Sequence, residues 1–162
     1  FPGCTAHEVS PELILKLRRK YSNIKGCKDT VKDFAHTRKI CETVLPEFPD
    51  FEIYSGFDEF FVHNVMSGGA GCIGGLTNVC PELMADWVKA VNAKDWDESA
   101  KIQRKVNKLM DMFEICAPFL TAVKRALLIQ GVISNEYGSE PNVIANDAED
   151  AKIREILEAI KD

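Results

Sequence analysis

Hydrophobic residues follow two alternating spacings in the first part of the chain. Apolar residues three and four positions apart predict helices over 11–21, 29–45, 58–66 and 81–91. Short apolar runs between them, at 23–27, 51–56 and the end of the glycine-rich segment 68–75, predict strands. This order of elements is typical of parallel βαβ units and predicts an α/β fold.

The rhythm changes beyond about Lys94, where only helical spacing continues. Asp95 caps a long helix, Pro118 begins another that ends at Gly131, and a final helix carries the apolar residues of 153–160. We therefore expect two domains, an α/β body over 1–93 and a helical extension over 94–162.

Composition is that of an ordinary soluble domain. The 162 residues are 46% hydrophobic and 28% charged, with a formal net charge of -5, which gives no electrostatic basis for binding nucleic acid or an anionic membrane. The longest apolar runs are too short to span a bilayer. Six scattered cysteines, without paired metal-ligand spacing, predict free thiols, no metal site and a cytoplasmic location.

Lys28 is the first candidate for chemistry. It ends the strand predicted at 23–27, and Asp29-Thr30 after it are typical of a helix start. Barrels of parallel strands place their reactive groups at such strand ends. A lysine desolvated there can lose its proton and attack a carbonyl to form a Schiff base. The alternative is an ordinary surface lysine beside a helix cap.

The next two strand ends carry groups suited to a polar ligand. Gly56 is followed by Asp58 and Glu59, whose carboxylates can accept hydrogen bonds from polyol hydroxyls, and the glycines of 68–75 allow close backbone approach. Alternatively, the two acids only complement a helix dipole. We expect His36 and His63 to be surface or packing residues, because the spacing fixes no carboxylate to orient either ring.

These motifs together resemble the pyruvate-dependent class I aldolases and lyases: dihydrodipicolinate synthase, N-acetylneuraminate lyase and 2-keto-3-deoxygluconate aldolase. The similarity runs from residue 1 to about 134 through Gly-Cys-Lys-Asp-Thr at 26–30, Tyr-Ser-Gly-Phe-Asp-Glu at 54–59 and the glycine-rich segment. It implies a (β/α)8 barrel with a C-terminal helical extension. It also implies a Schiff base between Lys28 and pyruvate or another 2-keto acid, without a separate cofactor. The residues implied to lie beside the Schiff base or line the substrate pocket are Gly56, Asp58, Glu59, Ile73, Gly74 and Gly75.

The same resemblance predicts that these residues form the C-terminal portion of the barrel. Only three strands are predicted, and three parallel strands cannot close a barrel that typically needs about 250 residues. The proton-relaying tyrosine and the loop that holds the pyruvate carboxylate in the family would precede residue 1. We therefore expect the chain to need a complementary N-terminal half for activity and to form a homo-oligomer, usually a tetramer in this family.

Individual positions narrow the substrate that the resemblance implies. Cys4 stands where dihydrodipicolinate synthases carry an arginine for a substrate carboxylate, which argues against that reaction. Asp58-Glu59 is similar to the sialic acid lyases, whereas Lys28-Asp29-Thr30 with His36-Thr37 is similar to the 2-keto-3-deoxy sugar acid aldolases.

Gly75, where the lyases tend to have serine, favours a 2-keto-3-deoxy sugar acid over sialic acid. Dihydrodipicolinate synthase activity and a non-catalytic module on the same fold remain the alternatives. A helix bundle is disfavoured because each glycine of 68–75 would cost about 1 kcal/mol of helix stability.

Overall fold

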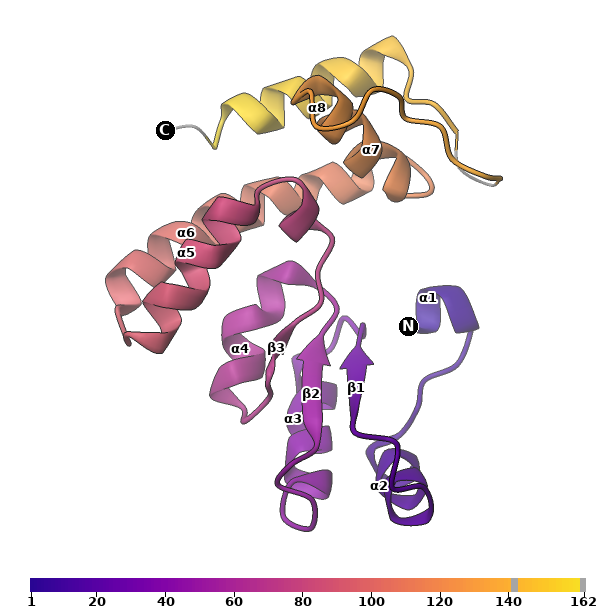
Figure 1. Cartoon of the computed structure of the whole chain (residues 1–162), viewed down its shortest axis with the longest axis vertical. Coiled ribbons are helices and arrows are strands. Elements are labelled where there is room, and N and C mark those ends of the chain that lie inside the picture. The colour runs from indigo at the N-terminus through magenta and orange to yellow at the C-terminus, as the bar shows by residue number, and fades with distance from the viewer. Residues whose placement is uncertain (141–142, 161–162) are drawn as a thin grey trace. The chain divides into compact units, whose positions relative to one another are not determined.

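Three short strands form a parallel sheet in the order β1-β2-β3 (Figure 1). In the computed structural model, which describes residues 1–140 and 143–160, they are β1 (Gly26–Asp29), β2 (Glu52–Ser55) and β3 (Gly71–Cys72). Lys28 is in register with Tyr54, and Tyr54 with Gly71. The parallel order confirms the predicted βαβ arrangement and brings the carboxyl ends of the three strands to one edge of the sheet.

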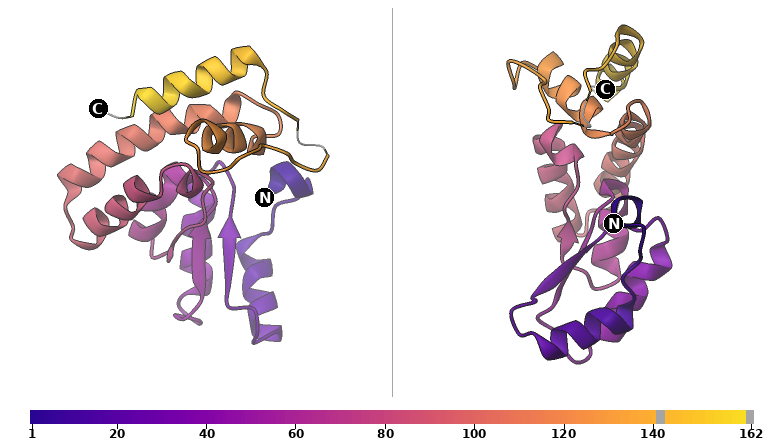
Figure 2. Two further views of the ribbon diagram at one scale, coloured as in Figure 1. Left: turned by 45° about the horizontal axis from the view of Figure 1, so that its top comes forward. Right: turned by 90° about the vertical axis from the view of Figure 1, so that its right-hand side faces the viewer.

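The sheet belongs to a compact unit, Phe1–Gly74. Its other elements are α1 (Pro2–Thr5), α2 (Pro11–Lys20), α3 (Phe34–Val44), the 3-10 turn η1 (Asp58–Phe60) and α4 (Phe61–Met66). Figure 2 shows α2 and α3 side by side. Their apolar faces and β2 enclose one buried core, formed by Ile14, Ile40, Cys41, Val44, Phe51 and Ile53.

The second compact unit, Gly75–Asp162, contains helices and no strand among its described residues. It contains η2 (Leu76–Asn78), α5 (Pro81–Asn92), α6 (Trp96–Met110), η3 (Asp111–Glu114), α7 (Leu120–Ile129) and α8 (Asp147–Glu158). The α5 and α6 helices pack side by side, as do α7 and α8. Asp95 caps α6 as predicted, and its side chain accepts from the backbone N–H of Glu98 at 3.0 Å.

The two units divide earlier than the expected domains. The change falls between Gly74 and Gly75, so that α5 groups with the helices, on which it packs, rather than with the strands. The division at 93–94 into a barrel portion and an extension stays a prediction, because a compact unit and an evolutionary domain need not coincide.

The predicted helix start at Asp29-Thr30 is wrong. The strand β1 continues through Asp29, and α3 begins at Phe34, where the Asp33 side chain accepts from the N–H of Ala35 at 2.9 Å. Phe34 is 47% exposed, and the buried positions of α3 are Thr37, Ile40, Cys41 and Val44.

Among the described residues, no helix combines the length and the apolar character that crossing a membrane requires. All six cysteine thiols are free.

Candidate functional site

Lys28 lies inside β1 rather than after it, one residue before the strand ends. Its register partner is Tyr54 of β2, so both side chains belong to the same face of the sheet. Lys28 is exposed. The described residues therefore do not supply the desolvation expected of a nucleophilic amine, because that face carries no facing wall of strands within the first unit.

Tyr54 is a polar neighbour that the sequence analysis did not single out. Its phenol donates a hydrogen bond to the Glu52 carboxylate at 2.9 Å, and this bond raises the pKa of Tyr54. A strand period of two places Glu52 and Tyr54 on one face, so the strand pattern could have identified the pair. The face that carries Lys28 thus also carries a phenol and a carboxylate.

Asp29 points to the opposite face, toward the first turns of α3. Its carboxylate is 4% exposed, accepts a hydrogen bond from Thr37 Oγ1 at 2.6 Å and contacts His36 Nδ1 at 3.0 Å. His36 is thus a half-buried packing residue, as expected, yet the reason given was wrong, because a carboxylate does orient its ring. That carboxylate was missed because Asp29 was assigned to a helix start instead of a strand.

Gly56, directly after β2, is in close contact with Thr30, which follows β1. A Cβ on Gly56 would overlap the Thr30 hydroxyl and lie 2.7 Å from Thr30 Cβ. Thr30 is 7% exposed, and its hydroxyl has no hydrogen-bond partner among the described residues. A buried hydroxyl of this kind, two residues after Lys28, is a further candidate for ligand binding that the sequence analysis did not name.

The two acids after Gly56 differ in exposure. Asp58 begins η1 and is 0% exposed, and its carboxylate lies against Gly74, where a Cβ would overlap it. Glu59 is only half-buried. The structure thus brings Asp58 and Gly74 together, and leaves Glu59 the more accessible carboxylate.

Ile73 and Gly75, the remaining residues of the predicted substrate pocket, lie on opposite sides of the boundary between the two compact units. Ile73 is 52% exposed and donates its backbone N–H to the Ser55 carbonyl at 2.9 Å, which ties it to the end of β2. Gly75 belongs to the helical unit, where a Cβ would come within 3.0 Å of the Phe113 ring. A role for the Ile73 carbonyl beside a Schiff base stays a prediction.

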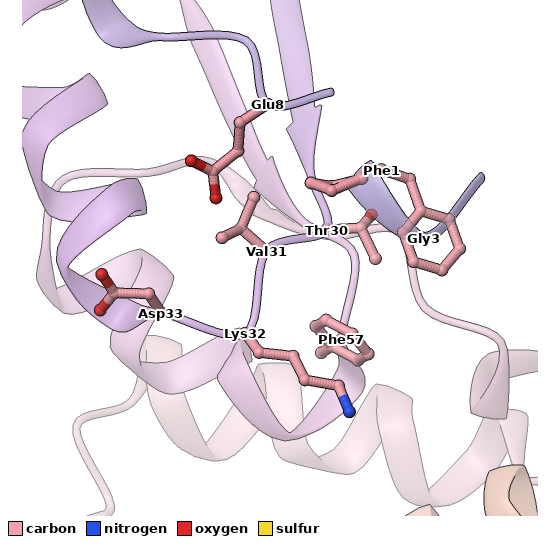
Figure 3. Close-up of a pocket in the computed structure, with 9 residues that line it drawn as sticks. Phe1, Gly3, Glu8, Thr30, Val31, Lys32, Asp33 and Phe57 are labelled. Atoms are coloured by element: carbon pink, nitrogen blue, oxygen red, sulfur yellow. The ribbon is translucent and has the colours of Figure 1, made fainter. Parts of the chain in front are cut away.

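A pocket of about 510 Å³ opens where the chain leaves β1. Figure 3 shows Phe1, Thr30 and Phe57 around it, with the Lys32 side chain running past the Phe57 ring. The pocket adjoins the buried Thr30 hydroxyl, so it offers an apolar wall and a polar group close together, as ligand pockets commonly do.

Two thiols lie within the strands. Burial raises the pKa of Cys27 to about 12 and that of Cys72 to about 11. Neither thiol is a nucleophile near neutral pH, because the reactive form is the thiolate. Within 1–140 and 143–160, no three His, Cys, Asp or Glu side chains are placed to hold a metal ion.

The parallel sheet, with helices between its strands, defines the class as α/β proteins. More specifically, the chain belongs to the dihydrodipicolinate synthetase family, which it matches over residues 1–160. Two Escherichia coli K12 proteins are among its relatives. YagE, provisionally named a 2-dehydro-3-deoxy-D-gluconate aldolase, is 26% identical over 99% of this chain and 53% of its own length. YjhH, provisionally named a 2-dehydro-3-deoxy-D-pentonate aldolase, is 27% identical over 98% and 53%.

The fold comparison agrees with the family. The crystal structure of YagE in complex with pyruvate superposes with a TM-score of 0.95, at 26% identity, over 99% of this chain and 54% of that one. The chain therefore spans about half the length of the relatives it matches. Its fold is that of the C-terminal portion of a (β/α)8 barrel with a C-terminal helical extension, as predicted.

Proposed function

We propose that the chain carries the Schiff-base lysine of a class I aldolase or lyase that makes or breaks a carbon–carbon bond between pyruvate and an aldehyde. The single observation that carries this proposal is the position of Lys28 near the carboxyl end of β1, in a chain of this family. The names of YagE and YjhH favour a 2-keto-3-deoxy sugar acid as the substrate.

In the proposed reaction, the neutral Lys28 amine attacks the ketone carbon of the 2-keto acid, one proton is taken up, and water leaves to give an iminium ion. The hydroxyl on the carbon that becomes the aldehyde then gives up its proton, the carbon–carbon bond breaks, and the iminium accepts its electron pair, which yields an enamine and releases the aldehyde. Protonation of the enamine and hydrolysis then return pyruvate and the free amine. The chemistry needs no separate cofactor, since the covalent imine is the electron sink.

The remaining site residues are assigned to the aldehyde end of the substrate. Glu59 accepts hydrogen bonds from hydroxyl groups of the sugar chain, and Thr30 contributes its buried hydroxyl nearby. Gly56 and Gly74 belong to the same end of the site, where the lack of a Cβ makes room for Thr30 and for the Asp58 carboxylate. The complementary barrel half, a homo-oligomer and a cytoplasmic location belong to the same proposal.

The test is to trap the imine. The chain is incubated with pyruvate and borohydride, alone and with the N-terminal portion of YagE added to supply the remaining strands, and the modified peptide is identified by mass spectrometry. We expect reduced pyruvate on Lys28 and none in Lys28→Met. Modification of another lysine, or none in either arm, would overturn the assignment and would favour a non-catalytic module.

The aldehyde is identified separately. Trapping-competent protein is given a panel of 2-keto-3-deoxy acids, and pyruvate release is followed. Condensation of pyruvate with aspartate semialdehyde alone would instead support dihydrodipicolinate synthase activity.

A further inference from the structure

The carboxylate next to the proposed nucleophile is tied to helix α3. Asp29 follows Lys28 directly, and the alternation of a strand sends their side chains to opposite faces of the sheet. Thr37 Oγ1 donates to Asp29 Oδ2 at 2.6 Å, and His36 Nδ1 lies 3.0 Å from Oδ1. Both partners lie near the beginning of α3, so two adjacent helix residues hold both oxygens of one carboxylate.

The backbone of Asp29 is fixed as well. Its carbonyl accepts a hydrogen bond from the N–H of Gly56 at 2.7 Å, which joins the end of β1 to the residue that follows β2. A carboxylate that is 4% exposed needs such partners, because burying a charge without hydrogen-bond partners is strongly unfavourable. Asp29 is therefore held by its side chain to α3 and by its main chain to the neighbouring strand.

His36 is committed to this contact. An ionised carboxylate can only accept, so the ring hydrogen must be on Nδ1. The other ring nitrogen, Nε2, is buried and has no hydrogen-bond partner among the described residues. The ring also borders a small cavity of about 120 Å³ that Lys28 and Asp29 help to line. The one polar interaction that the described residues give this ring is thus the one with Asp29.

We propose that Asp29, His36 and Thr37 are positioning residues that fix the direction of the Lys28 amine. The inference rests on the proposed function of Lys28. Consecutive residues of a strand share one peptide unit, so a backbone rotation at Asp29 that releases its carboxylate also changes the direction in which the Lys28 side chain leaves the strand. Attack on a carbonyl requires a near-attack geometry, and a displacement of about 1 Å can cost on the order of a hundredfold in rate.

The test distinguishes the effect of the Thr37 hydroxyl from the effect of its branched side-chain shape. Thr37→Val removes the donor and keeps the branched form, whereas Thr37→Ser keeps the donor. Arg38→Gln is the matched control on the same helix, since Arg38 is exposed and pairs only with Glu42 among the described residues. Each variant is assayed for the rate of imine trapping at Lys28 as a function of pyruvate concentration, with circular dichroism to verify folding.

We expect Thr37→Val to lower the maximal trapping rate by about tenfold or more, with the half-saturating pyruvate concentration changed by less than about twofold. Thr37→Ser should retain the rate to within about threefold, and Arg38→Gln should not change it. Equal losses in Thr37→Ser and Thr37→Val, or a folded Thr37→Val that traps at the wild-type rate, would overturn the proposal. A Thr37→Val variant that changes only the half-saturating pyruvate concentration, and not the maximal trapping rate, would also overturn the proposal.

A second measurement does not depend on activity. Nitrogen NMR of the histidine rings should find the His36 hydrogen on Nδ1 in the wild type and a changed tautomer or shift in Asp29→Asn. A wild-type His36 ring with its hydrogen on Nε2 would overturn the proposed positioning role of Asp29, His36 and Thr37, even if pyruvate is trapped on Lys28. If pyruvate is never trapped on Lys28 of the wild type, the proposed function is overturned instead. Asp29, His36 and Thr37 would then have no nucleophile to position.

Discussion

Gly74 and the Asp58 carboxylate are in direct contact, and no space remains between them for even a methyl group. Asp58 is 0% exposed, so it has no free room into which to withdraw. The contact explains why a glycine follows Ile73 at this point: the chain must pass directly over a buried acid at the start of η1.

We predict that Gly74→Ala destabilises the protein by about 2–3 kcal/mol, because either the backbone after β3 or a buried carboxylate has to move. Urea unfolding followed by circular dichroism measures the change. Gly3→Ala is the control, since its new Cβ would meet only the movable Phe1 side chain. An unfolding free energy equal to that of the wild type would contradict the described contact.

A related prediction concerns Gly56 and Thr30. Gly56→Ala should destabilise the protein by about 1–3 kcal/mol, because the new Cβ overlaps the Thr30 hydroxyl. Thr30→Ala removes that hydroxyl but leaves a Cβ 2.7 Å away, so it should relieve the clash only in part. A double-mutant cycle in urea measures the coupling. Additive changes in the free energy of unfolding would show that Gly56 and Thr30 are not in close contact.

The sequence was sufficient for the order of the elements and for the parallel arrangement of the strands, and insufficient for the residues at which each element begins and ends. Asp29-Thr30 has the composition of a helix cap, yet the strand continues through Asp29. The reason is tertiary: Thr37 and His36 satisfy the Asp29 carboxylate only when β1 reaches that far. A local pattern cannot contain a partner that lies seven or eight residues away on another element.

The candidate site divides in the same way. Lys28, Gly56 and Gly74 could be chosen as candidates from the sequence, because a strand end and a glycine have local signatures, and their roles in a site stay a prediction. Their contacts could not be predicted, since only tertiary packing places Thr30 against Gly56 and Asp58 against Gly74. Nor do the described residues enclose Lys28, so the desolvation that its proposed chemistry requires would come from other parts of the proposed barrel.

Glu59 offers a test of the substrate end of the site. Glu59→Gln should lower kcat/KM for cleavage of 2-dehydro-3-deoxy-gluconate by about tenfold to a hundredfold, because a charge-assisted hydrogen bond is worth about 1.5–3 kcal/mol. Pyruvate trapping at Lys28 should stay within about twofold, since pyruvate has no polyol chain to contact this residue. Glu47→Gln, which alters a pair with Arg19 at the surface, is the control. Loss of trapping in Glu59→Gln would place Glu59 at the pyruvate end instead.

The thiols should differ sharply in reactivity. Cys4 is exposed, whereas Cys27 and Cys72 are kept protonated by the burial that raises their pKa values to about 12 and about 11. Iodoacetamide at about pH 8 should therefore alkylate Cys4 first, because the thiolate is the reacting species. Peptide mass spectrometry over time measures the order. Modification of Cys27 as fast as Cys4 would mean that β1 is not packed on α3 in solution.

The same two thiols predict how stability depends on pH. An unfolded cysteine has a pKa near 8.5, so the unfolded state loses these protons first as the pH rises, and the folded state binds more protons. Stability is therefore fully present below about pH 8.5 and falls above it, by up to about 1.4 kcal/mol per pH unit for each thiol. Urea unfolding at about pH 8, 9 and 10 measures the slope in the wild type and in Cys27→Ala/Cys72→Ala. Lysine and tyrosine titration is common to both proteins, so the wild type should lose more stability with pH, and equal slopes would contradict the buried placement of the two thiols.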